Sequence, residues 1–483
     1  MAKAPFFWLI ANLAASATLL NTALMSSAIE PISATGWRAL YSKPALSLCA
    51  FWFFLGVAYY LPSPIRYLLR GAVETIARTP SIPAVPTRPK TPTKTAQPVG
   101  AKRNKPKATK KAAVQAIEDP KQKALAHFAA RLSATARKKG VTRITHYGDS
   151  LIDLDHITAP LRRTYQKRFG DAGHGFSLMA KPWPWYNQID VGLARGQGWK
   201  TYRLVGGKRP DFRLGLGGSA AESEGGKRWL RIWTKPTIPF SQVEIAYLKR
   251  PKGGSFDIVV DKKTIKTVDT SAAKIGSGFA RVELSDAAHR VRLKVRGRVR
   301  IFGATLERKQ PGVVWDNLPL VSVRFHQLAK IDADNWREQL AHRGSDLVIF
   351  QFGANDSRNY GGDLKRYGEK IATVLGRLHR ALPKASCLVI GPLDQLVKNS
   401  RGQLRSPKVI RRVAERQREV AIAGGCAFWD AQLAMGGPGS MKTWLDRRLT
   451  LKDMVHLHPK GGALIAERFD RALTAALSHY RAR

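Results

Sequence analysis

A nearly continuous apolar run, D-L-V-I-F-Q-F at Asp346–Phe352, places the strongest constraint on how this chain folds. A strand that is apolar at successive positions is buried on both faces, which is typical of a parallel sheet covered by helices. Strand patterns are also found at Val141–His146, Cys387–Pro392 and Cys426–Asp430. Helical spacing is found at 119–139, Ile157–Phe169, Asp332–His342, Tyr367–Leu382, Lys408–Ala423 and Gly461–Leu477. This alternation predicts an α/β domain with a parallel central sheet.

The α/β pattern is interrupted between residues 183 and 310, where short alternating runs are separated by Gly, Pro and Asp turns. These runs are Trp229–Trp233, Val243–Leu248, Phe256–Val260, Arg290–Val295 and Arg298–Phe302. Alternation with period two and frequent turns predicts an all-β sandwich. We therefore expect an α/β domain in two parts, 119–182 and 311–483, with residues 183–310 inserted between them.

The first 78 residues are predicted to anchor the protein in a membrane. Pro5–Ile29 and Pro44–Pro64 contain no charged residue, and each is close to the roughly 20 residues that cross a bilayer. They fit one or two transmembrane helices, or a signal peptide followed by one helix.

Residues 79–118 are rich in proline and lysine and are expected to form an extended linker. The positive-inside tendency favours a cytoplasmic linker if both segments span, whereas an external catalytic domain requires only one span or an external N-terminus. We expect an extracytoplasmic, periplasmic catalytic domain, with the topology left open.

The chain has 81 basic and 35 acidic residues, a formal net charge of +46, which indicates an anionic partner. No zinc-finger, homeodomain or RNP-like pattern is present, so we expect no specific binding of nucleic acid. Cys49, Cys387 and Cys426 are too few and too irregularly spaced to predict a disulfide framework or a cysteine metal site. We expect all three to be small buried hydrophobic residues.

Three short motifs carry chemistry. Ser150 follows a predicted strand in Gly148-Asp149-Ser150, on a turn where a hydroxyl is exposed to substrate. A hydroxyl nucleophile needs a base, and the base needs a residue that orients it. Asp453 lies three residues before His456 and can contact its ring, whereas His458 is a competing base with less natural spacing. Asn355 follows the apolar strand, where its amide could donate to an oxyanion.

Each motif alone is more often an ordinary turn, cap or loop ion pair. Their joint occurrence at strand ends favours a catalytic site, because open α/β sheets bind ligands at the carboxyl ends of their strands. Y-G-D-S-L, F-G-A-N-D and D-M-V-H-L-H-P-K-G resemble the conserved blocks of SGNH (GDSL-type) hydrolases. Two longer stretches, I-T-A-P-L-R-R-T-Y-Q-K-R-F-G-D-A-G-H-G-F and F-W-D-A-Q-L-A-M-G-G-P-G-S-M, resemble the peptidoglycan O-acetylesterase branch with an inserted carbohydrate-binding-like β domain.

The resemblance covers about residues 143–477 and implies a three-layer α/β/α domain that needs no metal or cofactor. It implies Ser150 as nucleophile, His456 as base and Asp453 as the residue that orients it. The Ser150 N–H and the Asn355 amide would be oxyanion donors. The family's third donor is a glycine N–H in a block that aligns with 317–324, and we align that glycine with Ser322.

The leading hypothesis is a serine esterase that removes O-acetyl groups from a cell-envelope polysaccharide, with peptidoglycan favoured. The insertion would present the glycan through Trp229 or Trp233, although both tryptophans also fit a core. The alternative is a membrane-tethered protein that binds a glycan or polyanion and has weakened or lost esterase activity. Ser322 and the basic linker motivate that alternative.

Overall fold

The computed structural model describes residues 115–206, 211–358 and 362–481. They belong to one compact unit, Lys107–Arg483. The predicted membrane segments and nearly all of the linker lie outside the described residues. Within the described ranges, no helix combines the length and the apolar character needed to cross a membrane.

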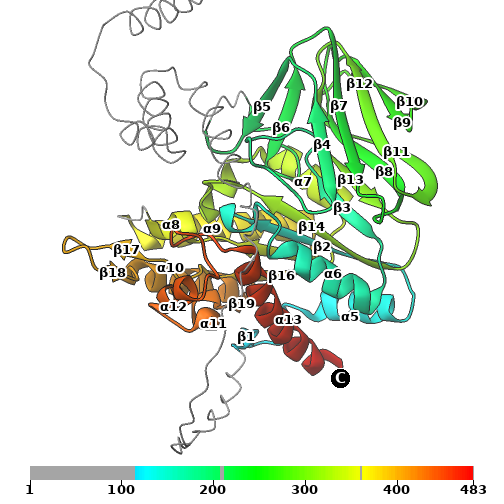
Figure 1. Cartoon of the computed structure of the whole chain (residues 1–483). Coiled ribbons are helices and arrows are strands. Elements are labelled where there is room, and N and C mark those ends of the chain that lie inside the picture. The colour runs from blue at the N-terminus through cyan, green and yellow to red at the C-terminus, as the bar shows by residue number, and fades with distance from the viewer. Residues whose placement is uncertain (1–114, 207–210, 359–361, 482–483) are drawn as a thin grey trace, which may run out of the picture. The chain divides into compact units, whose positions relative to one another are not determined.

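A six-stranded sheet forms the centre of the α/β domain, in the order β1-β19-β16-β15-β2-β14 (Figure 1). Its strands are β1 (Ile117–Glu118), β2 (Val141–Gly148), β14 (Gly312–Pro319), β15 (Leu347–Gln351), β16 (Ser386–Ile390) and β19 (Ala427–Trp429). All neighbours pair in parallel except β1, which runs antiparallel to β19. The predicted α/β fold with a parallel sheet is confirmed.

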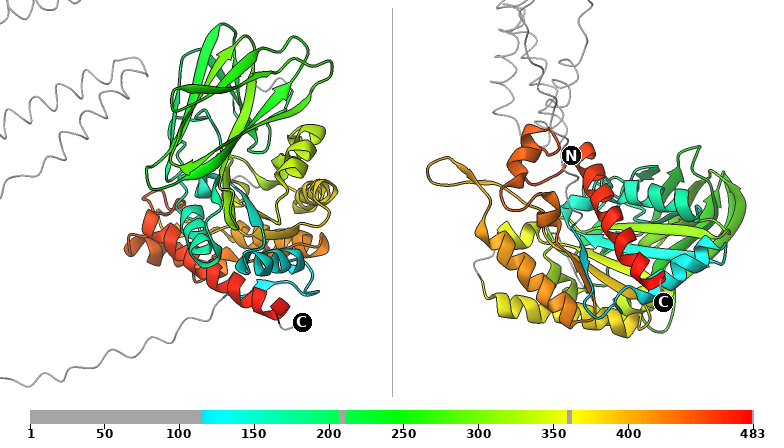
Figure 2. Two further views of the ribbon diagram at one scale, coloured as in Figure 1. Left: turned by 90° about the vertical axis from the view of Figure 1, so that its right-hand side faces the viewer. Right: turned by 90° about the horizontal axis from the view of Figure 1, so that it is seen from below.

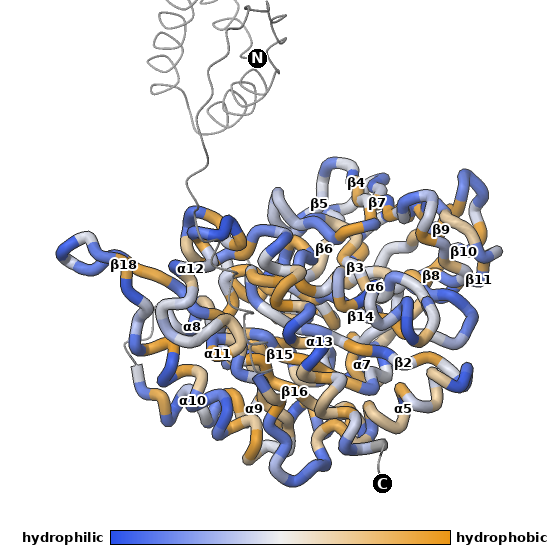
Figure 3. Tube along the Cα trace, turned by 60° about the horizontal axis from the view of Figure 1, so that its bottom comes forward, coloured by the Kyte–Doolittle hydropathy of each residue, from blue (hydrophilic) through white to orange (hydrophobic). Residues whose placement is uncertain are grey.

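Helices cover both faces of this sheet. On one face lie α5 (Ala126–Ala136), α6 (Thr158–Phe169) and α13 (Pro459–Arg481), and on the other α7 (Ala333–Arg343), α9 (Leu364–Ala381) and α10 (Lys408–Ala423), as Figure 2 shows. Strand β15 serves both layers, because Ile349 belongs to the first core and Phe350 to the second. This is why the strand is apolar at nearly every position, and hydrophobic residues accordingly concentrate in β15 and β16 in Figure 3.

Two antiparallel sheets make up the insertion, in the orders β10-β9-β12-β7-β4 and β11-β8-β13-β6-β5. Their strands are β4 (Val191–Arg195), β5 (Trp199–Arg203), β6 (Ser219–Ser223), β7 (Lys227–Thr234), β8 (Phe240–Lys249), β9 (Ser255–Val260), β10 (Lys263–Asp269), β11 (Gly276–Ala287), β12 (Arg290–Arg296) and β13 (Arg300–Glu307). Side chains from both sheets, such as Leu293 and Ile245, share one core. The predicted antiparallel β insertion is confirmed.

Strand β3 (Gly173–Ser177) connects the insertion to the α/β domain and is not among the strands expected from the sequence. It pairs with β13 of the insertion. Gly175 has a φ of 93°, and a Cβ there would lie 2.5 Å from Oδ1 of Asp316 in β14. Only glycine permits this close approach, so the glycines shape a strand crossing rather than a phosphate loop.

A buried ionic network holds the same junction together. The Arg343 guanidinium donates to both carboxylate oxygens of Asp316, at 2.7 and 2.8 Å, and to Glu307 at 2.5 Å. Arg143 of β2 also donates to Glu307, at 2.8 Å. These pairs hold the pKa of Glu307 at about 2 despite its burial, which acts in the opposite direction. The network therefore joins α7, β14 and β2 to the last strand of the insertion.

Several short elements complete the described chain. They are η1 (Ser150–Ile152), η2 (Phe325–Lys330), α8 (Ala354–Arg358), β17 (Val397–Lys398), β18 (Leu404–Arg405), α11 (Ala431–Met435) and α12 (Ser440–Asp446). Strands β17 and β18 form an isolated hairpin.

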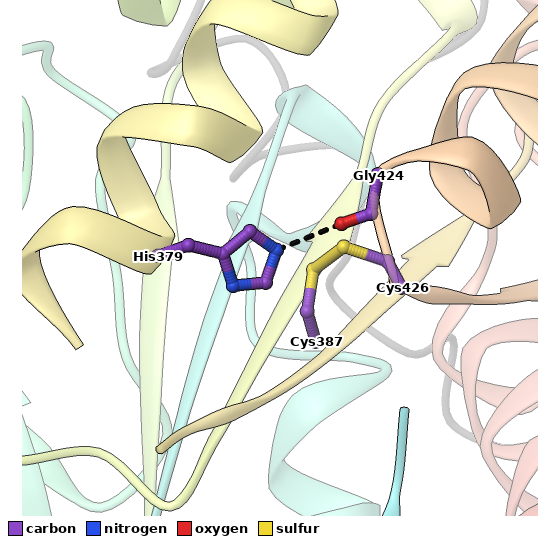
Figure 4. Close-up of a disulfide and its surroundings, with 4 residues drawn as sticks. All are labelled: His379, Cys387, Gly424 and Cys426. Carbon is purple, nitrogen blue, oxygen red and sulfur yellow. Dashed lines mark hydrogen bonds between the residues drawn. A yellow bond between two sulfur atoms is a disulfide. The ribbon is translucent and has the colours of Figure 1, made fainter. Parts of the chain in front are cut away.

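Cys387 and Cys426 are buried as expected, but the expectation that they take no part in a disulfide was wrong, and Cys49 lies outside the described residues. Cys387 and Cys426 form a disulfide, with their Cα atoms 4.6 Å apart (Figure 4). Leu388 pairs with Ala427 in the parallel register of β16 and β19, so the residues immediately before them lie side by side. Close to this bond, Nε2 of His379 donates to the Gly424 carbonyl at 2.9 Å. The register of the two strands brings together cysteines that are 39 positions apart in the sequence. Their spacing alone does not predict that they form a disulfide.

Candidate active site

The carboxyl end of β2 presents Ser150 as the first residue of the short η1 turn. The Asp149 carboxylate stabilises this turn through hydrogen bonds. Its Oδ1 accepts the Leu151 N–H at 3.0 Å, and its Oδ2 accepts the Ala354 N–H at 3.1 Å. Burial raises the pKa of Asp149 to about 6, although these N–H groups oppose the rise. One buried carboxyl thus joins the Ser150 turn to the loop that follows β15.

The loop before α13 brings His456 to Ser150. Nε2 of His456 lies 2.8 Å from Oγ of Ser150, and Nδ1 lies 2.6 Å from Oδ2 of Asp453. The other oxygen of Asp453 accepts the N–H groups of Val455 and His456, at 3.0 and 2.9 Å. Partial burial raises the pKa of Asp453, but its hydrogen bonds to His456 and Val455 outweigh that effect and the net pKa is lowered. Asp453 therefore stays ionised while it shapes the loop and holds the ring.

His458 does not take part in this contact. Its Nδ1 accepts the Lys460 N–H at 3.3 Å, and its own N–H donates to the Leu449 carbonyl at 3.0 Å. His458 therefore supports the start of α13, and the two histidines of H-L-H have separate positions.

Asn355 contacts the segment that contains Ser322. The Asn355 amide donates to the Val323 carbonyl at 3.2 Å. Ser322, which precedes that residue, is exposed and has a φ of 63°. This left-handed conformation favours glycine, and a residue with a Cβ adopts it at a cost. The structure thus brings the Asn355 amide to the segment that contains Ser322, and gives Ser322 a backbone suited to glycine.

A second buried carboxyl near the site was not recognised in the sequence. Asp153, one turn after Ser150, accepts the indole N–H of Trp183 at 3.0 and 2.9 Å. Burial raises the pKa of Asp153 to about 6, while the indoles of Trp183 and Trp185 and the nearby His456 oppose the rise. The Trp185 side chain is 57% exposed. The only sequence signal was K-P-W-P-W-Y, in which two prolines hold two tryptophans in an irregular loop.

Asp356 is the third such carboxyl. It is fully buried, and its Oδ1 accepts the Phe325 N–H at 3.1 Å. Burial raises its pKa to about 7, and the neighbouring charge of Asp149 acts in the same direction. The position directly after Asn355 therefore anchors η2, the turn that follows Ser322.

Across the residues that the structure describes, no group of three or more His, Cys, Asp or Glu side chains is arranged to hold a metal ion. A hydroxyl bonded to an imidazole, which is bonded in turn to a carboxylate, is the constellation that activates a serine for attack on an acyl carbon.

Comparison with known proteins gives two informative matches. Residues 291–464 match the GDSL-like lipase/acylhydrolase family, a range that includes Asn355, Asp453 and His456 but not Ser150. A solved structure of a peptidoglycan O-acetylesterase in action is similar, with 26% identity over 73% of this chain and 96% of that chain, and a TM-score of 0.62. No curated protein sequence matches the chain.

More distant similarity is found to a family two carbohydrate esterase from Clostridium thermocellum in complex with cellohexaose. The identity is 10% over 58% of this chain and 99% of that chain, with a TM-score of 0.25. An acetyl xylan esterase has 15% identity over 33% of this chain and 80% of that chain, with a TM-score of 0.26. Similarities this weak carry no argument about substrate. Together with the motifs at Ser150, Asn355 and His456, the two informative matches identify the α/β domain as a GDSL-like (SGNH) hydrolase domain, which is that of an esterase.

Proposed function

We propose that the protein removes O-acetyl groups from a cell-envelope polysaccharide, peptidoglycan being the favoured substrate. The observation that carries this proposal is the hydrogen-bonded series from Ser150 through His456 to Asp453. The similarity to a peptidoglycan O-acetylesterase over nearly all of that chain supports the choice of glycan. That similarity covers 73% of this chain, which is more than the two α/β parts contain.

Acyl transfer to the enzyme would begin with Ser150. Its Oγ attacks the carbonyl carbon of the acetyl ester, while Nε2 of His456 accepts the hydroxyl proton. The imidazolium that forms is stabilised by Asp453, which accepts the Nδ1–H. Because the pKa of Asp453 is lowered, the carboxylate is already ionised when that charge develops.

The oxyanion would be bound by the N–H groups of Ser150 and Ser322 and by the amide of Asn355. Preorganised donors of this kind supply much of the rate enhancement in acyl transfer. The Asn355 amide donates to Val323 in the present structure, so it has to turn towards the substrate or share its two N–H groups. His456 then gives its proton to the sugar oxygen, which leaves as a hydroxyl. Water, activated by His456, hydrolyses the acetyl-serine and releases acetate.

We further propose that the protein is membrane-anchored and that its catalytic domain is extracytoplasmic. The apolar segments in the first 78 residues motivate the anchor. The Cys387–Cys426 disulfide supports an external catalytic domain, because disulfides persist in oxidising compartments and are rare in the cytosol.

Acetate release tests the function directly. The full-length protein is incubated with O-acetylated peptidoglycan, acetylated xylan and p-nitrophenyl acetate, and released acetate is measured. We expect turnover of all three, with the highest kcat/KM on peptidoglycan. Faster release from xylan would contradict the choice of substrate. Ser150→Ala should abolish turnover while the melting temperature stays unchanged, and undiminished turnover would contradict the mechanism.

A further inference from the structure

A basic pocket of about 460 Å³ lies on the insertion, on strands β7, β9 and β12 and the turn after β9. These strands are neighbours in the five-stranded sheet, seen at the upper right of Figure 1. Five cationic side chains line the pocket: Arg231, Lys262, Arg290, Arg292 and Lys294. None of these residues belongs to the site around Ser150.

Two of the arginines occupy positions that are unfavourable for the stability of the sheet. Arg231 and Arg292 are directly opposite each other in the antiparallel register of β7 and β12. Like charges at directly opposed positions destabilise a sheet. Their neighbours Ile232 and Leu293 are buried on the inner face, so the arginines point to the outer face. Stability of the sheet therefore does not explain the pair.

Acidic residues do not neutralise the pocket. Within the described part of the chain, none of the five cationic side chains forms an ion pair with a carboxylate. Asp261 also lines the pocket, but its oxygens accept from His289 at 2.6 Å and from the Arg290 N–H at 2.9 Å. Asp257 on β9 is bonded to Arg296. The Nε of Arg292 is buried and has no hydrogen-bond partner among the described residues.

Trp229 orients the two opposed arginines. The guanidinium carbons of Arg231 and Arg292 lie 5.4 and 5.0 Å from the centre of the Trp229 ring. Cation–π contact holds a guanidinium plane while leaving its N–H groups available to an anion. The Trp229 ring contacts two guanidinium groups, so this face of the sheet is suited to recognition of charge more than to contact between Trp229 and a sugar.

We propose that this pocket binds an acidic polysaccharide through carboxylate or phosphate groups along its chain. Arginine forks suit both groups, because each can accept two parallel N–H hydrogen bonds. The pocket would hold a glycan on the insertion without taking part in ester hydrolysis. The choice of a glycan as carrier of the anion rests on the function proposed above, whereas the binding measurement below does not depend on it.

Nucleic acid fits the pocket less well. Binding of single strands relies on aromatic rings on which bases stack. Trp229 is engaged by two guanidinium groups, and a Cβ on Gly192 would lie 2.1 Å from the Trp233 ring, so both tryptophans are covered in part. The chemistry left open to a ligand is a cluster of guanidinium and ammonium groups.

The net charge of +46 gives every polyanion some affinity for the protein, so the test needs variants of equal charge. The test variant is Arg231→Thr/Arg292→Thr, since threonine is suited to strands. The control is Arg380→Gln/Lys384→Gln, which removes two exposed charges at the end of α9 that form no ion pair with described residues. Arg231→Lys/Arg292→Lys keeps the charge in the pocket.

Dissociation constants are measured for the full-length proteins with polygalacturonate, its carboxyl-amidated form, phosphomannan and a DNA duplex, at several salt concentrations. We expect the threonine variant to bind polygalacturonate or phosphomannan about tenfold more weakly, from two lost charge-assisted contacts. Its salt dependence should also be shallower. The control should stay within about twofold, the lysine variant should bind more tightly than the threonine variant, and the threonine variant should keep a cooperative melting transition.

The anion is a carboxylate if the threonine variant loses affinity for polygalacturonate, and a phosphate if it loses affinity for phosphomannan. Equal losses in the threonine and control variants would overturn the proposal, as would an equal loss for amidated glycan or for DNA. Hydrolysis of p-nitrophenyl acetate is followed in the same samples and should be the same in all variants. A wild type without esterase turnover would refute the proposed function and leave the binding result standing.

Discussion

The two sides of the active site are organised to different degrees. On the acid–base side, His456 contacts Ser150 at 2.8 Å and Asp453 at 2.6 Å, which are the contacts that attack on an ester requires. On the oxyanion side, the Asn355 amide is bonded to a backbone carbonyl and Ser322 holds a left-handed conformation. The serine, histidine and carboxylate contacts are thus already formed in the structure, whereas the proposed oxyanion role of Asn355 requires that its amide either turns towards the substrate or offers its second N–H.

The largest loss of activity is expected from the replacement of Asp453. Asp453→Asn should lower kcat about 10⁴-fold, because an amide in place of the carboxylate favours the wrong tautomer of the histidine. Stopped-flow or steady-state hydrolysis of p-nitrophenyl acetate measures the loss. Asp446→Asn is a matched control, since Asp446 is an exposed residue whose one ion pair among the described residues is with Lys442. A similar loss in both variants would show that net charge, and not the orientation of His456, is responsible.

The oxyanion side is tested by Asn355→Ala. We expect kcat to fall about 10²–10³-fold, the effect of removing one oxyanion donor. KM should stay nearly constant if the amide acts only in the transition state. A raised KM with unchanged kcat would mean that Asn355 binds ground-state substrate and that the oxyanion side consists of backbone groups alone.

Asp149 links the two sides, so its replacement tests their coupling. Asp149→Asn leaves a buried N–H of Leu151 or Ala354 without an acceptor, which should lower the free energy of unfolding by about 1–3 kcal/mol. Chemical denaturation at pH 7 measures this change. A variant as stable as the wild type would show that the carboxyl is not needed to connect the loops.

The same variant should alter the pH dependence of stability. The pKa of Asp149 is raised from 3.8 to about 6 by burial, so its contribution is fully present below pH 3.8 and is lost as the pH rises through 6. The wild-type free energy of unfolding should therefore decline more steeply than that of Asp149→Asn between pH 4 and 6. Equal slopes would mean that Asp153 and Asp356 account for the whole dependence.

The smallest effect is expected at Ser322. Ser322→Gly should raise the free energy of unfolding by about 0.5–1 kcal/mol, because glycine adopts a φ of 63° without the steric cost of a Cβ. Ser322→Ala keeps the Cβ and should bring no gain. Esterase turnover of the glycine variant should stay within about threefold of the wild type. A lower stability of Ser322→Gly would mean that the serine side chain stabilises this backbone.

Local patterns made much of the acid–base side predictable. Asp453 and His456 are three residues apart, so one loop brings them into contact wherever that loop lies in the fold. Strand β15 was predictable because its burial on both faces leaves an apolar run. Strand β14 was not among the predicted strands, because a carboxylate such as Asp316 is not expected in a core. Asp316 is buried there because both of its carboxylate oxygens accept hydrogen bonds from Arg343 on α7.

The features that were missed depend on pairings between distant parts of the chain. The disulfide follows from the register of β16 and β19, and the burial of Asp153 follows from the loop that contains Trp183. The basic pocket depends on the pairing of β7 with β12, which puts Arg231 beside Arg292 although they are far apart in sequence. A sequence alone gives the residue types but not the strand registers that combine them.

The disulfide also has a consequence for chain entropy. It closes a loop of 39 residues that contains α10, and such a cross-link removes about 4 kcal/mol of conformational freedom from the unfolded chain. After β16 the chain continues to Leu396, whose N–H donates to the Met454 carbonyl, and to Gln395, whose amide donates to the Ala354 carbonyl. The loops of His456 and Asn355 therefore both rest on a segment whose unfolding is made less favourable by a single covalent bond.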